Sequence, residues 1–145
     1  LLVAGLLIVA AAMTLLDQEG GGGGDEPAAP LVGLSFDDPT GVQAVIETVR
    51  ATGRLPDHYV TKLEAEALGW RPGSDLCDAA PDRVIGGDRF GNREGLLPDA
   101  PGRQWYEADL DFDCGRRGAK RLVFSNDGLI FVTVDHYESF VEETE

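Results

Sequence analysis

The sequence predicts an α+β fold in which about three N-terminal helices pack on a C-terminal antiparallel β-sheet. Apolar side chains recur at helical spacing between capping residues over residues 38–80. After Pro81 the chain changes to short runs rich in β-branched and aromatic residues, separated by turns. Asn126-Asp127-Gly128 lies between two of these runs and is a strong signal for a tight hairpin. Helices followed by hairpin-connected strands are typical of the α+β class.

The first predicted helix begins at Asp38-Pro39, a capping residue followed by a proline, and ends at Gly53. Its apolar residues fall at i, i+3, i+4 and i+7, which places them in one stripe on one helix face. They are Val42, Val45, Ile46 and Val49.

Two shorter helices are expected next. Thr61 and Glu64 form a capping box, and Gly69 ends that helix. A third helix is predicted over residues 75–80, closed by Pro81, and Trp70 between the two is expected in the core. The strands are predicted over residues 83–90, 103–112, 119–125, 129–134 and 140–141.

The N-terminal part of the chain differs from the rest. Residues 1–16 are uncharged and almost wholly apolar, which predicts a signal peptide or a membrane anchor whose start lies upstream of this sequence. The sequence does not distinguish cleavage from retention. Residues 17–35 contain five consecutive glycines, Gly20 to Gly24, and are predicted to be a flexible linker. The folded domain is therefore predicted over residues 36–145.

The charge of the chain limits the classes of function that it can have. The net charge is −14, and residues 36–145 carry all 12 basic and 22 of the 26 acidic residues, a net charge of −10. Phosphate is repelled by such a domain at long range, which argues against a general nucleic-acid binder. Any nucleic-acid chemistry must depend on a local basic patch. The one dense basic cluster in the sequence is Arg116, Arg117, Lys120 and Arg121.

This basic cluster lies between a candidate base and a candidate acid. Glu107 precedes it in a predicted strand, and His136 follows it. Phosphodiester cleavage without a metal or other cofactor needs one group that takes a proton, one that gives a proton, and fixed positive charge beside the phosphorus. Each residue alone fits a plain surface position as well or better. Their occurrence together favours the catalytic interpretation.

Six separated motifs occur in order over about residues 40–142. They are Leu55 to Lys62, Ala65 to Trp70, Ile85 to Asp88, Asn92 to Gly95, Trp105 to Asp109, and Asp135-His136-Tyr137. Together they resemble the barnase–binase group of secreted bacterial ribonucleases. The resemblance implies a microbial ribonuclease fold and an endoribonuclease that cleaves single-stranded RNA on the 3′ side of guanosine, through a 2′,3′-cyclic phosphate and without metal. The need for a 2′-hydroxyl would spare DNA.

The resemblance also implies roles for residues of the site. Glu107 resembles the general base and His136 the general acid, and the cations beside the phosphate would be Lys62, Arg117 and Arg121. Asp88 and Asp109 resemble acids that hold those cations in place.

Base recognition is expected from Phe90, Asn92, Arg93, Glu94 and Tyr137. Guanine offers two adjacent N–H donors to a carboxylate such as that of Glu94, and adenine lacks this pair. Phe90 and Tyr137 are expected to pack beside the base.

The sequence departs from the family pattern at four positions. Arg116 replaces an aromatic residue, and Gly91, Gly118 and Gly128 replace larger ones. None of these is a proposed proton-transfer group, so we expect them to affect affinity and rate. The acidic net charge predicts weaker and less salt-dependent RNA binding than in basic members.

Two other features allow alternative interpretations. Asp109, Asp111 and Asp113 alternate as in a calcium loop, but Cys114 and Lys120 occupy the positions where that loop needs Gly and Glu. We therefore predict a solvated acidic face. Cys77 and Cys114 predict a disulfide in a secreted protein, with a catalytic thiol as the alternative.

Three hypotheses for the function remain. The first is a secreted or membrane-tethered ribonuclease, monomeric, whose RNA cleavage calls for a barstar-like inhibitor in the producing cell. The second is a module on the same fold that binds RNA or guanine nucleotides without cleaving. The third is the toxin domain of an interbacterial effector, with the same chemistry.

Overall fold

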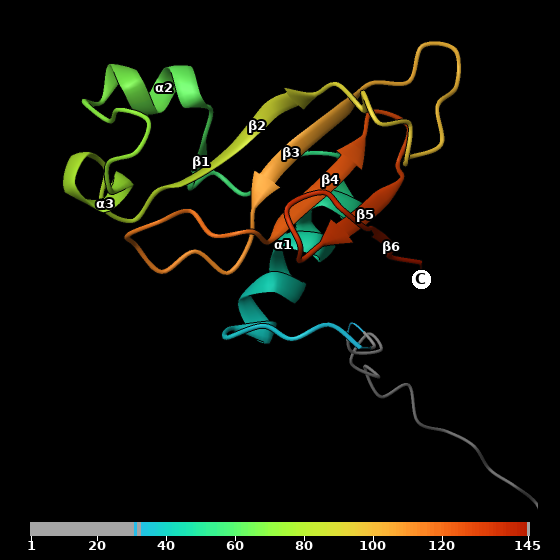
Figure 1. The fold of residues 1–145 in the computed structure, drawn as a ribbon, viewed down its shortest axis with the longest axis horizontal. Coiled ribbons are helices and arrows are strands. Elements are labelled where there is room, and N and C mark those ends of the chain that lie inside the picture. The colour runs from blue at the N-terminus through green and yellow to red at the C-terminus, as the bar shows by residue number, and fades with distance from the viewer. Residues whose placement is uncertain (1–30, 32, 145) are drawn as a thin grey trace, which may run out of the picture.

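The computed structural model describes residue 31 and residues 33–144, and it confirms the α+β class (Figure 1). The predicted signal or anchor segment, and the part of the linker up to residue 30, lie outside these residues. Within the described part, no helix is both long and apolar enough to cross a membrane. The elements are α1 (Pro39–Thr52), β1 (Tyr59–Val60), α2 (Lys62–Ala67), α3 (Leu76–Ala79), β2 (Val84–Phe90), β3 (Trp105–Asp109), β4 (Arg121–Ser125), β5 (Ile130–Thr133) and β6 (Val141–Glu142).

The sheet has its six strands in sequence order, from β1 to β6. All neighbouring pairs are antiparallel except β1 and β2, which run parallel. The sequence did not predict β1, because two residues are too few to show a period of two. The predicted hairpin is confirmed: β4 and β5 are joined at Asn126–Gly128, where Gly128 has a φ of 98°.

The edge strand β1 is tied to β3 across β2 by the side chain of Tyr59. The hydroxyl of Tyr59 donates a hydrogen bond of 2.7 Å to the carbonyl oxygen of Asp109 in β3. A Cβ atom at Gly86 in β2 would lie 2.5 Å from the ring of Tyr59 and 2.7 Å from the Cβ of Ala108. Only glycine therefore fits between these two strands at that position.

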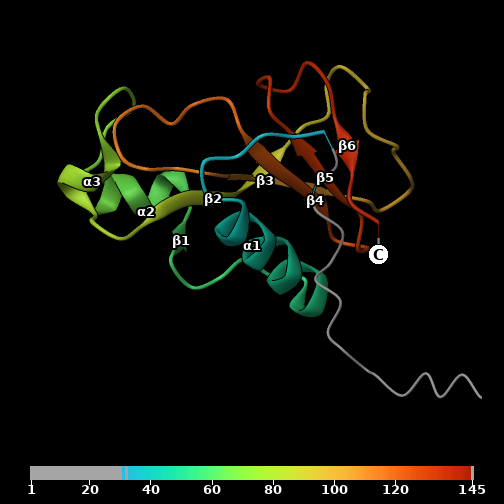
Figure 2. The same cartoon turned by 90° about the horizontal axis from the view of Figure 1, so that it is seen from below.

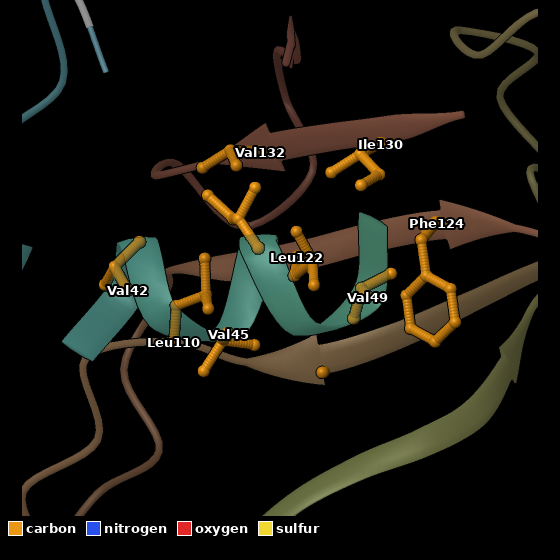
Figure 3. Packing of buried hydrophobic residues seen from close by; sticks show 10 residues of the cluster. Val42, Val45, Val49, Leu110, Leu122, Phe124, Ile130 and Val132 are labelled. Atoms are coloured by element: carbon orange, nitrogen blue, oxygen red, sulfur yellow. The ribbon is translucent and has the colours of Figure 1, made fainter. Parts of the chain in front are cut away.

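Helix α1 covers one face of the sheet, as its apolar stripe predicted (Figure 3). Its cap is formed by Asp38, whose carboxylate accepts a hydrogen bond from the amide of Gly41, and Gly53 ends it in the left-handed region. The predicted valines and Ile46 are all buried against β3, β4 and β5. Leu31 and Leu34, from the segment predicted to be linker, also pack against this cluster.

Helices α2 and α3 lie together beyond the β1 edge of the sheet (Figure 1). They share a second hydrophobic cluster with β1 and β2. The capping box of Thr61 and Glu64 is present, and Trp70 is buried as predicted. The predicted disulfide between Cys77 and Cys114 is also present, with the two Cα atoms 5.6 Å apart. It joins α3 to the loop between β3 and β4.

Figure 2 shows α1 on one side of the sheet. A third hydrophobic cluster lies on the opposite face. Trp105 and Val123 belong to this cluster, whereas Ala108 and Leu122 belong to the α1 side. Because side chains alternate along a strand, Glu107 and the Trp105 side chain lie on the same face. The face away from α1 therefore positions the candidate catalytic residues.

Candidate active site

A cleft of about 680 Å³ opens on the face of the sheet away from α1. Four segments form it: the start of α2, the end of β2 with the loop that follows, β3, and the turn after β5. Its lining comprises Lys62, Arg89, Phe90, Gly91, Asn92, Arg93, Glu94, Leu96, Glu107, His136, Tyr137, Glu138 and Phe140. Eight of the residues predicted from the sequence thus border a single cavity. Among the other predicted residues, Asp88, Asp109, Arg117 and Arg121 do not line it.

Glu107 lies at the floor of this cleft, with only 13% of its side chain exposed. One carboxylate oxygen is 3.1 Å from the ammonium nitrogen of Lys62, and the other accepts a hydrogen bond of 2.6 Å from the hydroxyl of Tyr137. Burial and the neighbouring Glu107 raise the pKa of Tyr137 above its ordinary value, so the phenol keeps its proton and acts as a donor. The carboxylate is thereby fixed from two sides.

Two of the predicted cations are held by one buried carboxylate, that of Asp109, which is 1% exposed. Arg117 donates two hydrogen bonds of 2.8 Å to its two oxygens, and this pairing raises the pKa of Arg117. The Nε of Arg121 lies 3.0 Å from the same carboxylate as an ion pair, without a well-directed hydrogen bond. A bidentate arginine–carboxylate pair fixes both groups in orientation as well as in position.

His136 lies at the rim of the cleft and is exposed. Its backbone N–H donates to the carbonyl oxygen of Ala119, 3.1 Å away, and its ring centroid is 5.0 Å from that of Tyr137. Both His136 and Tyr137 have positive φ angles, 55° and 71°. Two successive non-glycine residues in the left-handed region are uncommon and cluster at functional sites.

The loop after β2 is organised by Asn92, which is buried. Its side-chain NH2 group donates a hydrogen bond of 2.9 Å to the carbonyl oxygen of Leu97, and its side-chain oxygen accepts one of 3.1 Å from the backbone N–H of Leu97. Arg93 and Glu94 are exposed toward the cleft. Phe90 stacks on Tyr137 with ring centroids 5.0 Å apart. The Asn92 side chain therefore fixes the shape of the loop from inside, while Arg93 and Glu94 face solvent.

The acidic residues near the site are engaged in different ways. Asp88 accepts a hydrogen bond of 3.0 Å from the backbone N–H of Lys62, which fixes the start of α2. The predicted solvated face of three acids is wrong, since the side chains of Asp109 and Asp111 are only 1% and 2% exposed, and Asp113 alone of the three is exposed. The strand ends at Asp109, and Asp111 has a φ of 57°, so strand alternation does not extend through these residues.

Asp111 anchors the basic loop to the start of α1. Its carboxylate accepts a hydrogen bond of 2.8 Å from the ammonium group of Lys120, and it also accepts hydrogen bonds from the backbone amides of Asp37 and Asp38. Burial would raise the pKa of Asp111, but these hydrogen bonds outweigh burial and hold the pKa below its ordinary value. Lys120 is thereby engaged in structure and does not line the cleft.

The two cysteines lie near Asp75, with potential ligand atoms of the three residues within 4.8 Å of one another. Both sulfurs are bonded to each other in the disulfide, so neither is a thiolate that could bind a metal or act as a nucleophile. The catalytic-thiol alternative is therefore excluded for this oxidised chain.

Sequence reasoning missed some residues of the cleft. The contact of the Tyr137 hydroxyl with Glu107 was not foreseen, because the two residues are 30 positions apart and come from different elements. Leu96, Glu138 and Phe140 also line the cleft. Their motifs carry no chemistry of their own, so only the folded chain identifies them.

Arg117 and Arg121 do not line the cleft, but the guanidinium of Arg121 lies 6.0 Å from the centre of the Tyr137 ring that does. A buried carboxylate between an ammonium and a phenol, with an imidazole at the same cleft and arginines fixed nearby, forms an acid–base site suited to a phosphodiester. Comparison with known proteins agrees with this class. A sequence model of the ribonuclease family matches residues 43–144, and the chain belongs to this family.

Three relatives show the extent of the similarity. A ribonuclease of Heyndrickxia coagulans is 54% identical over 88 residues, which are 60% of this chain and 81% of the relative. A ribonuclease of Bacillus intermedius is 54% identical over 88 residues, which cover 60% of this chain and 54% of that protein. Guanyl-specific ribonuclease St of Saccharopolyspora erythraea is 46% identical over 55 residues, 37% of this chain and 54% of the relative.

Proposed function

We propose that this chain is a guanyl-preferring endoribonuclease that cleaves single-stranded RNA by acid–base transphosphorylation, without a metal cofactor. Glu107 is the general base and His136 the general acid. The observation that carries the proposal is the Glu107 carboxylate, held between Lys62 and Tyr137 in the same cleft that His136 borders.

The first step forms a cyclic product. Glu107 takes the proton of the ribose 2′-hydroxyl, and the 2′-oxygen forms a bond to phosphorus. The bond between phosphorus and the 5′-oxygen breaks, and His136 gives its proton to that leaving oxygen. The products are a 2′,3′-cyclic phosphate and a 5′-hydroxyl. In hydrolysis of the cyclic phosphate, the two residues exchange roles with water as the nucleophile.

Positive charge next to the reacting phosphorus has to be in place before the reaction to be effective. Asp109 supports this role, because it fixes Arg117 in a bidentate pair and keeps Arg121 beside it. Lys62 contributes a third cation at Glu107. The cationic requirement is thus met locally in a domain whose net charge is negative.

Guanine preference is assigned to the loop at Phe90 to Glu94. The exposed carboxylate of Glu94 borders the cleft and is available to accept two hydrogen bonds from the guanine edge. The name of one relative, guanyl-specific ribonuclease St, supports this preference. The disulfide supports action outside the cytoplasm, where such bonds persist. A barstar-like inhibitor, a monomeric state and a signal or tether at residues 1–16 complete the proposal.

A dinucleotide assay tests the mechanism. Wild-type protein is incubated with guanylyl-uridine in excess EDTA, beside Glu107→Ala and His136→Ala. We expect cleavage that EDTA does not affect and a loss of about 10²–10⁴-fold in kcat for each variant, the usual contribution of a proton-transfer group. His58→Ala and Glu66→Ala are matched controls, because both residues are exposed and neither borders the cleft.

Three results would overturn the proposal. Activity that requires a divalent ion would remove the metal-independent mechanism, and wild-type rates in both cleft variants would remove the assigned roles. A wild-type protein that binds guanosine monophosphate but cleaves nothing would identify a binding module in place of an enzyme.

A further inference from the structure

The turn after β5, residues 133–139, is closed by a network of hydrogen bonds centred on Asp135. One carboxylate oxygen accepts two hydrogen bonds, one of 2.8 Å from the hydroxyl of Thr133 and one of 2.9 Å from the backbone N–H of Ser139. The other oxygen accepts from the hydroxyl of Ser139. The hydroxyl oxygen of Thr133 also accepts 3.1 Å from the backbone N–H of Tyr137. Asp135 thus joins the start of the turn to its end.

The two residues enclosed by this network are His136 and Tyr137, both in the left-handed region. Non-glycine residues keep such a conformation only where the surrounding structure enforces it. Thr133 can supply that enforcement from one side, because it is 1% exposed and anchored in β5. Ser139 lies at the exposed end of the turn, so its connection to β5 depends on Asp135.

The imidazole of His136 has little else to hold it. Among the described residues, no hydrogen bond or ion pair involving its ring is found, and the side chain is exposed. Its contacts are the backbone hydrogen bond to Ala119 and the packing of its ring beside Tyr137. The location of the ring is therefore set by the backbone of the 133–139 turn.

We propose that Asp135 is a positioning residue for the general acid, which it holds at the cleft by clamping the turn that carries His136 and Tyr137. The inference depends on the proposed function, in which His136 gives a proton to the leaving oxygen. Asp135 itself does not line the cleft and does not touch the reacting atoms.

The clamp is available throughout the pH range in which a histidine can act. The hydrogen bonds from Ser139, through its hydroxyl and its amide, and from Thr133 lower the pKa of Asp135 to about 2. The carboxylate therefore remains an ionised acceptor under all conditions of the assay.

The opposite end of β5 provides a matched control. Asp127 accepts 2.5 Å from the hydroxyl of Ser125 in the hairpin between β4 and β5, and it pairs with Arg103. It too is an aspartate that closes an exposed turn of the same sheet through a serine, but its hairpin does not border the cleft. Asp127→Ala measures what the loss of a turn clamp does to the fold alone.

The test compares Asp135→Ala, Asp135→Asn and Asp127→Ala in guanylyl-uridine cleavage, at a temperature where circular dichroism shows each variant folded. We expect Asp135→Ala to lower kcat by about tenfold or more with KM within about twofold, because small displacements of a catalytic group cost up to about 100-fold. Asp135→Asn keeps an oxygen acceptor for Thr133 and for the Ser139 amide, and should recover most of kcat. Asp127→Ala should keep kcat within about twofold, whatever its melting temperature.

The inference is overturned if Asp135→Ala and Asp127→Ala have the same kcat, or if kcat and KM change together. If Asp135→Ala does not fold, Ser139→Ala against Ser125→Ala takes its place, with a loss of kcat expected only for Ser139→Ala. His136→Ala separates this inference from the proposed function. Wild-type cleavage by His136→Ala would refute the acid role, whereas an inactive His136→Ala beside a fully active Asp135→Ala would refute the clamp alone.

Discussion

The loops at the two ends of β3 both carry residues of the site but are held in different ways (Figure 1). The cation loop, residues 110–120, is fixed by the disulfide, by Arg117 on Asp109 and by Lys120 on Asp111. The recognition loop, residues 91–104, is held by the buried hydrogen bonds of Asn92.

This difference corresponds to what each loop has to do. Charges that stabilise a transition state act best when they need no reorganisation, so a covalent tie and buried ion pairs suit the cation loop. A loop that reads a base has to present backbone and side-chain groups to a ligand, and one buried amide is enough to set its shape. The cation loop should therefore lose the most stability when its anchors are removed.

Asp109→Ala should have the largest effect, because it removes the partner of Arg117 and Arg121 together. Arg121 is 3% exposed, so the change leaves a buried cation unpaired. Removing one partner of a buried pair costs about 3–5 kcal/mol. Urea unfolding should show a loss of this size, with Asp113→Ala, an exposed acid in the same loop, within about 0.5 kcal/mol of wild type. Equal losses in both variants would contradict the anchoring role of Asp109.

Replacing both cysteines by serine should have the next largest effect. Cys77 and Cys114 are separated by 37 residues, and closing a loop of that order stabilises a domain by about 2–4 kcal/mol. Thermal unfolding with and without dithiothreitol measures the change. The reductant should destabilise wild type to about the level of the double variant and leave the double variant unaffected. A wild-type protein insensitive to complete reduction would show that the ion pairs alone hold the cation loop.

Asn92→Ala should cost less than either change, since it removes two neutral hydrogen bonds of the recognition loop. The amide and carbonyl of Leu97 would be left without partners in a buried position, at about 1–3 kcal/mol. Asn92 also has a φ of 47°, which alanine adopts poorly. Asn92→Gly accepts that φ and loses only the hydrogen bonds, so urea unfolding of both variants separates the two causes. Equal stability of both variants and wild type would contradict this account.

The sequence predicted the elements that are marked by a local pattern of residues. The valine stripe of α1, the capping box of α2 and the Asn126–Gly128 hairpin each depend on neighbours within a few positions, and all three are present. The pairing of β1 with β2 was missed, because it depends on a parallel partner more than twenty positions away.

The candidate site was predictable as a set of residues and not as a geometry. The family motifs named Glu107, Lys62 and Tyr137, but not that both side chains hold the carboxylate of Glu107. The burial of Asp111 was missed for a related reason, because its partners are Lys120 and two backbone amides near residue 37. Backbone amides leave no trace in a sequence pattern.

Glu94→Gln should have the smallest effect on stability and a selective effect on base preference. Glu94 is exposed in the recognition loop, so the free energy of unfolding of the variant should stay within about 0.5 kcal/mol of wild type. Glutamine offers one acceptor where the carboxylate offers two, and a lost bidentate contact to a base is worth about 1–3 kcal/mol, or roughly 10–100-fold in discrimination. The measurement is the ratio of kcat/KM for guanylyl-uridine to that for adenylyl-uridine.

Glu138→Gln is the control that makes this last result interpretable. Glu138 is also an exposed acid at the same cleft, but it follows Tyr137 in the turn after β5 and lies outside the recognition loop. Both variants remove one negative charge from the cleft, so both should bind the substrate phosphate somewhat better. Only Glu94→Gln should lower the preference for guanine. If the two variants change the ratio equally, the effect comes from charge and the recognition loop reads guanine through its backbone alone.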